Sequence, residues 1–149
     1  MTIKKANIKD LNNDLIKLYI NGFIYHYNAR PDIFKCIDEK KLENEIRQKI
    51  ENDEDVLIIL EENKVIGFLI YDIKIKHDKI MWIDQLIIDE KYRKKGYGKK
   101  LIENAEEIAK QENCVRIEFS CWSFNTDALE MYKHIGYKEQ RIIFEKNID

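Results

Sequence analysis

Apolar residues recur in steps of three and four along the first part of the chain, as expected for a helix with one buried face. Between residues 8 and 27 they fall at Ile8, Leu11, Leu15, Leu18, Tyr19, Gly22 and Phe23. We expect this helix to end before Arg30, because Pro31 disfavours helical geometry at the residue that precedes it. A second, highly charged helix is predicted after the N-cap residue Asp38, with Leu42, Ile46 and Ile50 on one face.

The middle of the chain instead carries three apolar segments separated by short polar turns. Residues 56–60, 65–76 and 80–88 are rich in β-branched and aromatic residues, which is typical of strands. The turns are Glu62-Asn63-Lys64 and His77-Asp78-Lys79. Strands joined by such short turns run in opposite directions, so these segments predict an antiparallel meander. Residues 2–6 form a candidate first strand.

The last third of the chain alternates between helical and extended patterns. A helix is predicted over 98–112, a strand over 115–121, a short helix over 127–134 that Gly136 ends, and a final strand over 137–146. The element order is therefore β-α-α-β-β-β-α-β-α-β. The strand-helix-strand portion should form a parallel pair with a right-handed crossover. The predicted fold class is α+β with a mixed, mostly antiparallel sheet.

Length and charge exclude several kinds of protein. The 149 residues, 18.0 kDa in mass, contain no repeat or linker, so we expect one domain over residues 1–149. Lys and Arg number 26 and Asp and Glu 28, and the net charge of −2 argues against a nucleic-acid-coating protein. No apolar run approaches the roughly 18–20 residues of a membrane helix. The N-terminus lacks the apolar segment of a signal peptide, so we expect a cytoplasmic protein without membrane contacts.

The cysteines indicate neither a disulfide framework nor a metal site. Cys36, Cys114 and Cys121 are odd in number and form no Cys-x-x-Cys pair. No cluster of His, Cys and Asp has the spacing of metal ligands. We therefore expect reduced thiols and no bound metal.

The strongest local signal lies where the strand 80–88 runs through a basic loop into the next helix. Gly96 and Gly98, two of the five glycines in the chain, stand at the start of that helix. The flanking cations are Arg93, Lys94, Lys95, Lys99 and Lys100. A helix N-terminus offers unpaired N–H groups, and glycine lets a ligand approach the backbone closely. The loop therefore predicts a phosphate or pyrophosphate site, although a flexible loop with a solvated basic face has the same composition.

Two common phosphate-binding motifs do not fit this loop. The dinucleotide fingerprint requires a third glycine where this chain has Leu101. The P-loop requires a Ser or Thr directly after Gly-Lys, whereas Gly98 is followed by Lys99 and Lys100.

Two segments resemble the conserved blocks of the GCN5-related N-acetyltransferases (GNAT). The first is Arg93-Lys94-Lys95-Gly96-Tyr97-Gly98, which is similar to that family's Arg/Gln-x-x-Gly-x-Gly/Ala motif. The second is Asn125-x-x-Ala128-x-x-x-Tyr132-x-x-x-Gly136-Tyr137. One helix and one strand separate the two segments, as in the family. The resemblance implies the acyl-CoA N-acyltransferase fold over residues 2–146, in three α/β/α layers, with acetyl-CoA as cosubstrate and an amine as acceptor.

The resemblance also implies how acetyl-CoA would be bound. The glycine-rich turn would wrap its pyrophosphate, mostly through backbone N–H groups of Arg93, Lys94, Lys95, Gly96, Tyr97, Gly98 and Lys99. The strand end Leu86, Ile87 and Ile88 would pair with the pantetheine arm, and an N–H there would polarise the acetyl carbonyl. Asn125 would contact the cofactor arm or cap the short helix, a common structural role of asparagine.

Three residues are candidates for proton transfer. Tyr132 matches the tyrosine that protonates the departing thiolate in the family, but a tyrosine packed in the core with its hydroxyl bonded to backbone would look the same. Asp84 and Glu118 are acids inside apolar strands and are candidate general bases. Glu118 resembles the strand glutamate of ribosomal-protein N-terminal acetyltransferases, although two extra residues separate it from Asn125. Either acid could instead face solvent or pair with Arg116.

The acceptor side rests on the aromatic and polar residues 25–34, which include Tyr25, His26 and Phe34. In the family this region walls the acceptor pocket, and aromatic rings suit a cationic amine, but the same rings could be core packing under a loop. The expected reaction is direct attack of a small-molecule amine on acetyl-CoA in a ternary complex. Alternatives are a protein N-terminal or lysine acetyltransferase and a non-catalytic CoA-binding sensor. A homodimer whose final strand pairs across an interface is also compatible with the sequence.

Overall fold

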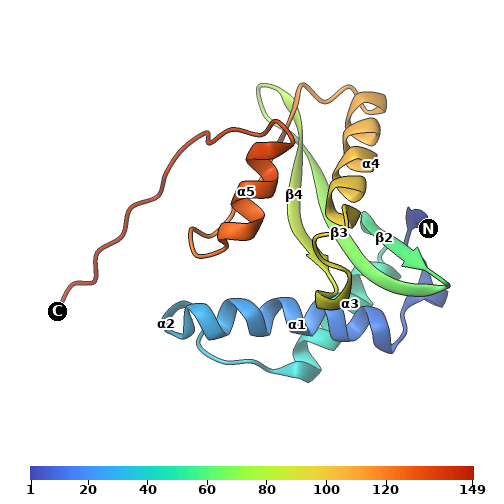
Figure 1. Ribbon diagram of the computed structural model, residues 1–149, viewed down its shortest axis with the longest axis horizontal. Coiled ribbons are helices and arrows are strands. Elements are labelled where there is room, and N and C mark those ends of the chain that lie inside the picture. The colour runs from blue at the N-terminus through green and yellow to red at the C-terminus, as the bar shows by residue number, and fades with distance from the viewer.

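A five-stranded sheet in the order β1-β2-β3-β4-β5 forms the centre of the protein, which the computed structural model describes over residues 1–149 (Figure 1). The strands are β1 (Thr2–Lys5), β2 (Val56–Glu61), β3 (Lys64–Ile75), β4 (Lys79–Ile88) and β5 (Arg116–Glu118). Neighbouring strands are antiparallel except β4 and β5, which are parallel. The predicted meander, the parallel pair and the α+β fold class are confirmed.

Helices cover both faces of this sheet. They are α1 (Asn13–Ala29), α2 (Pro31–Phe34), α3 (Glu39–Glu51), α4 (Tyr97–Gln111) and α5 (Thr126–His134), with short 3-10 turns at Ile8–Asp10 and Glu90–Tyr92. The Asp38 carboxylate accepts the backbone N–H of Lys41 at 3.1 Å, which confirms the predicted N-cap of α3. Helix α1 ends before Arg30 as expected, and Pro31 opens the one-turn helix α2. No helix is both long and apolar enough to cross a lipid bilayer.

The unbroken apolar runs of the central strands arise because both sheet faces are buried. In β2, Ile58 packs with α1 and α3 on one face, whereas Leu57 and Ile59 pack on the other face with α4. Phe68 and Leu69 of β3 divide between the faces in the same way. All five side chains are fully or almost fully buried. The sheet is therefore a rigid central layer on which the loops and helix ends of the site are mounted.

Strand β4 contains an extra residue, Asp84, at the point where it begins to leave β5. Ile70 of β3 pairs with Gln85 and Tyr71 pairs with Ile83, so Asp84 has no partner on β3. This is a β-bulge, which bends a strand and re-aims its side chains. On the other side, β4 pairs with β5 only over residues 80–82. The remainder of β4 therefore has no strand partner on the side towards β5.

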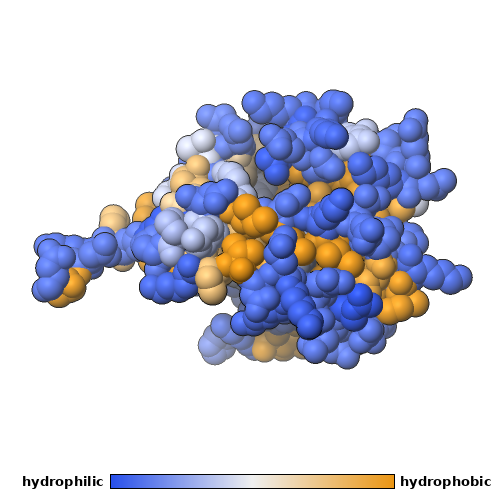
Figure 2. Space-filling model, turned by 90° about the horizontal axis from the view of Figure 1, so that it is seen from below, coloured by the Kyte–Doolittle hydropathy of each residue, from blue (hydrophilic) through white to orange (hydrophobic).

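The last predicted strand, 137–146, is wrong. Residues 138–149 form an extended tail that leaves the body beyond α5 (Figures 1 and 2), and none of their backbone groups is hydrogen-bonded within the chain. A segment forms a strand only when its backbone groups are hydrogen-bonded to a neighbouring strand. The tail is instead held at the α1–α2 corner by the ion pair between Arg30 and Glu145, whose charged atoms are 2.6 Å apart. Strand β5 is also shorter than the predicted 115–121.

Candidate functional site

The glycine-rich turn ends in an uncapped helix. Gly96 is the N-cap of α4 and has a positive φ of 85°, and no side chain caps the helix. The first α4 backbone N–H that is bonded along the helix belongs to Lys100, which donates to the Gly96 carbonyl at 3.1 Å. The amides of Tyr97, Gly98 and Lys99 thus lack intrahelical acceptors. Free amides, the helix dipole and nearby cations together favour an anion.

The side chains of the turn divide into two groups. Arg93 donates from Nε to the carbonyl of Ile88 at 3.0 Å, so it ties the turn to the end of β4. The Tyr97 hydroxyl donates to Glu61 at 3.3 Å, and burial together with Glu61 raises the pKa of Tyr97. Lys94, with φ of 60°, makes no side-chain hydrogen bond or ion pair within the chain, and Lys95 lies over the ring of Tyr92 at 5.7 Å. The backbone of the turn is therefore well anchored while cationic groups stay exposed.

Three elements meet beside these free amides: the end of β4, the start of α4 and the middle of α5. A Cβ placed on Gly98 would lie 3.6 Å from Met131 Cε and 3.7 Å from Ile88 Cγ1. Leu86, Ile87 and Ile88 pair with β3 on one side only. Asn125 stands at the N-cap of α5, but its side chain makes no capping bond, so the amide is free for another partner.

Tyr132 is mostly buried, with its ring packed on Phe119 at a centroid distance of 4.5 Å. Burial, and secondarily the Cys121 thiol, raises the pKa of Tyr132 well above its ordinary value, so the phenol is neutral at physiological pH. Its hydroxyl makes no hydrogen bond within the chain, and it is not a fully enclosed group. The Tyr132 hydroxyl is therefore a neutral donor. It lacks the hydrogen bond to backbone that we would expect of a tyrosine with a purely structural role.

The two acidic candidates have different surroundings. Glu118 accepts a hydrogen bond from Arg116 Nε at 2.7 Å, and Gln140 followed by Arg116 lowers the pKa of Glu118. Arg116 also contacts Asp78 at 3.1 Å, so Glu118 is part of an ion-pair network, as its alternative interpretation anticipated. Asp84 in the bulge has no ion-pair partner and lines an open cavity.

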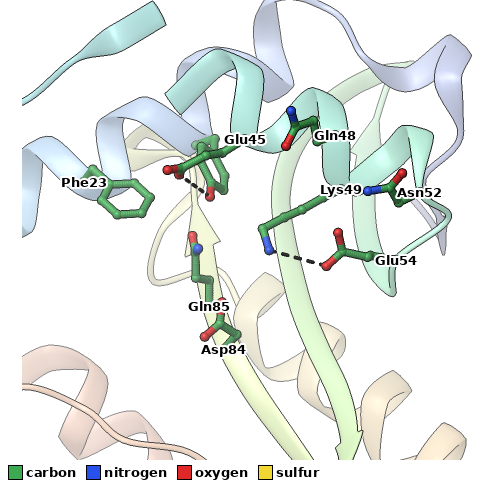
Figure 3. Close-up of a pocket in the computed structure, with 9 residues that line it drawn as sticks. Phe23, Glu45, Gln48, Lys49, Asn52, Glu54, Asp84 and Gln85 are labelled. Atoms are coloured by element: carbon green, nitrogen blue, oxygen red, sulfur yellow. Dashed lines mark hydrogen bonds and ion pairs between the residues drawn. The ribbon is translucent and has the colours of Figure 1, made fainter. Parts of the chain in front are cut away.

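This cavity, of about 330 Å³, lies between α1, α3 and β4 (Figure 3). Its lining residues are Tyr19, Phe23, Glu45, Gln48, Lys49, Asn52, Glu54, Asp84 and Gln85. Asp84 and Gln85 are consecutive yet both line it, because the bulge interrupts the alternation of β4. The Tyr19 hydroxyl donates to Glu45 at 3.3 Å, and burial raises the pKa of Tyr19 to about 12. Three carboxylates face one ammonium, so the cavity suits a cation.

Sequence reasoning missed most of this cavity and placed the acceptor region at 25–34. Tyr25 and His26 belong to α1 and Phe34 to α2, so these residues are not one loop. Their rings pack with Trp122 and Phe124 before α5, at centroid distances of 5.6–5.8 Å. Glu45 could have been noticed, because it directly precedes the buried Ile46 of the α3 face. Among all residues, no group of three metal-ligating side chains lies close together.

The comparisons with known proteins agree on one family. The model of the acetyltransferase (GNAT) family matches residues 9–137. Over 83 residues the chain is 30% identical to spermine/spermidine N(1)-acetyltransferase of Bacillus subtilis (strain 168), covering 52% of this chain and 55% of that protein. The chain therefore spans about half the length of this curated relative.

Solved structures share the whole fold. A mutant form of the BH1408 protein from Bacillus halodurans superposes with a TM-score of 0.85 at 23% identity, covering 99% of both chains. The structure of AAC(6')-Iy in complex with a CoA-based bisubstrate analogue superposes with a TM-score of 0.72 at 15% identity, covering 99% of this chain and 98% of that one. At these identities the likeness is one of fold.

Proposed function

The chain belongs to the acetyltransferase (GNAT) family, and from this premise we propose that it transfers an acetyl group from acetyl-CoA to a primary amine of a small cationic molecule. The observation that carries the proposal is the uncapped start of α4 beside the unpaired end of β4, with a carboxylate-lined cavity on the same strand. These features supply an anion site, an open strand edge and a cation site.

The donor would be bound by backbone groups. The free amides of Tyr97, Gly98 and Lys99 suit the pyrophosphate oxygens, and the exposed Lys94 and Lys95 add charge-assisted contacts. The unpaired edge of residues 86–88 offers N–H and C=O groups to the amides of the pantetheine arm. The neighbour of the same fold that binds a CoA-based analogue supports this assignment.

The proton transfers follow from the surroundings of two side chains. The acceptor nitrogen attacks the thioester carbon, and the carbon–sulfur bond breaks. Tyr132 would donate its proton to the leaving sulfur, since its hydroxyl is neutral and has no competing partner within the chain. The proton of the attacking amine would go to Asp84, directly or through water. Glu118 is the weaker candidate base, because its pKa is lowered and Arg116 occupies it.

The acceptor chemistry follows from the charges of the cavity. Lys49 is 3.6 Å from Glu54, which leaves Glu45 and Asp84 as two carboxylates without a cationic partner. Two such carboxylates suit a molecule with two or more separated ammonium groups, and Phe23 offers an apolar wall to the methylenes between them. A relative named as a spermine/spermidine acetyltransferase supports an acceptor of the polyamine class.

The test is thiol release from acetyl-CoA with spermidine, with a lysine-containing peptide and with a peptide bearing a free N-terminus. We expect turnover with spermidine and little with the peptides. Glu45→Gln should raise KM for spermidine roughly 10- to 150-fold, because a charged hydrogen bond contributes about 1.5–3 kcal/mol. The matched control is Glu43→Gln, which changes a half-exposed acid on the same helix that pairs with Arg47 outside the cavity.

Other outcomes would contradict specific parts of the proposal. Turnover on a peptide alone would refute the small-molecule acceptor. An unchanged KM in Glu45→Gln would remove the cavity from acceptor binding. Calorimetric binding of acetyl-CoA without turnover on any amine would indicate a CoA-binding module rather than an enzyme.

A further inference from the structure

Tyr19 is a buried phenol at the wall of the cavity between α1, α3 and β4. The residue is 1% exposed. Its ring packs against Phe23 at a centroid distance of 5.3 Å and against Phe68 at 6.0 Å, and such close packing restricts a side chain to one rotamer. Tyr19 nevertheless lines the cavity, and its hydroxyl donates to Glu45 Oε2 at 3.3 Å. The hydroxyl is therefore a hydrogen-bond donor held in a fixed place.

Three elements meet at this hydroxyl. Tyr19 belongs to α1, Glu45 to α3 and Gln85 to β4, and all three residues line the cavity (Figure 3). Burial raises the pKa of Tyr19 to about 12, and Gln85 opposes the rise, as expected when an amide N–H is directed at the phenol oxygen. Asp84 in the bulge adds to the rise, so its carboxylate also acts on the phenol. At physiological pH the phenol keeps its proton and can always donate it to Glu45.

Glu45 is the flexible member of this pair. It is half-buried on α3 and has no cationic partner within the chain. A glutamate side chain loses rotamer freedom when a ligand fixes it, and this loss weakens binding. A bond from a rigid donor restricts the side chain before the ligand arrives. A carboxylate accepts several hydrogen bonds, so the bond from Tyr19 leaves acceptor sites for an ammonium group.

We propose that Tyr19 is a positioning residue for the acceptor: its hydroxyl holds the Glu45 carboxylate on the α3 side of the cavity, across from Asp84 on β4. The two carboxylates then bind two ammonium groups of one molecule. This role rests on the proposed function, since it takes the cavity to be the site of a cationic acceptor. The cavity therefore selects a diamine over a monoamine of the same chain, and the selection depends on the hydroxyl of a residue that touches neither ammonium group.

The test compares putrescine with butylamine, which has the same four-carbon chain and one amino group fewer. Calorimetry measures the affinity of the full chain for each amine, and thiol release from acetyl-CoA gives KM and kcat. We expect the wild type to bind putrescine more tightly than butylamine. Tyr19→Phe should weaken putrescine binding and raise its KM roughly 3- to 10-fold, the range of a single hydrogen bond. Its kcat and its affinity for butylamine should stay near wild type.

Two further variants separate positioning from support of the fold. Tyr71 packs against the opposite sheet face, and burial followed by Asp55 raises its pKa to about 12 as well. Tyr71→Phe is therefore the matched control: it should lower Tm about as much as Tyr19→Phe and leave the ratio of the two amine affinities unchanged. In the Glu45→Gln background, Tyr19→Phe should cause no further loss of putrescine affinity, because residues that act as a unit are not additive.

The other results contradict named parts of the proposal. A wild type that binds butylamine as tightly as putrescine would overturn the selection of a diamine. Equal weakening of both amines in Tyr19→Phe would mean that the hydroxyl supports only the fold. Additive losses in the double variant would mean that Tyr19 does not act through Glu45. Binding of putrescine that depends on Tyr19, without acetyl transfer to any amine, would support this role of Tyr19 and refute the proposed function.

Discussion

Replacing Tyr132 by Phe separates a catalytic hydroxyl from a structural one. The hydroxyl makes no hydrogen bond within the chain, and the ring that packs on Phe119 is retained in the variant. The free energy of unfolding should therefore change by less than about 0.5 kcal/mol, as is typical of substitutions that break no contact. Loss of a general acid lowers the rate by roughly 10²–10⁴-fold. We expect kcat to fall by that amount while the affinity for acetyl-CoA and Tm stay near wild type.

Tyr137 supplies the matched control on the same aromatic cluster. Its ring packs on Phe119 at 5.2 Å, but its hydroxyl donates to Glu106 at 3.0 Å. Tyr137→Phe should lose about 1–2 kcal/mol of stability, since the bond is part-buried and charged. For a chain of this size that is a fall in Tm of roughly 2–8 °C. The two variants should therefore behave in opposite ways. Tyr132→Phe should lose activity and keep its stability, whereas Tyr137→Phe should lose stability and keep its activity.

The assay is steady-state thiol release with spermidine, combined with calorimetry of acetyl-CoA binding and thermal unfolding of each variant. An unchanged kcat in Tyr132→Phe would remove this residue from the mechanism. A fall in kcat together with an equal fall in affinity and a lower Tm would mean that the hydroxyl supports the fold rather than the reaction.

Three further predictions address the turn and the two acids. Gly96→Val should abolish acetyl-CoA binding measured by calorimetry, because a β-branched residue is strained at φ +85° by more than about 1–2 kcal/mol. The space around Gly96 is open, so the fold should survive the substitution. Wild-type affinity for acetyl-CoA in this variant would disprove the donor site. Asp84→Asn should lose activity near neutral pH and regain part of it at high pH, where more amine is unprotonated, whereas an unaltered pH–rate profile would exclude Asp84 as the base. Glu118 has a folded-state pKa below its ordinary 4.5, so its stabilisation is complete above about pH 4.5 and disappears as the pH falls through the folded value. The Tm difference between wild type and Glu118→Gln should therefore be constant near neutrality and vanish in acid, and a difference that persists in acid would mean that the ion pair is not its cause.

Local patterns in the sequence predicted the elements that depend on local forces. The helical period marked α1, α3 and α4, and the Asp38 cap was found because a side chain bonds a backbone group three residues away. The basic turn could be interpreted from Gly96 and its neighbours, since a helix N-terminus brings its own free amides. The predicted roles of Tyr132, Asp84 and Glu118 remain proposals, because spacing in a sequence does not set which proton moves.

The features that were missed depend on contacts between distant segments. Glu45 and Asp84 line one cavity only because α3 packs over β4, and no local pattern connects them. The bulge at Asp84 depends on how β3 and β4 pair, which neither strand encodes alone. The tail was predicted as a strand from its composition, but strand formation requires a hydrogen-bonded neighbour, and residues 138–149 have none.

The bulge also determines which sequence changes this protein can accept. The directions in which the Asp84 and Gln85 side chains point depend on the number of residues in β4. One extra residue in a strand interrupts the regular alternation of side chains between the two sheet faces. A substitution at either position alters one group and leaves the frame intact. Deleting Asp84 would restore regular pairing of β3 with β4, leave Gln85 opposite Ile70 and remove one carboxylate from the cavity. Relatives that use this carboxylate should therefore keep the extra residue in this strand.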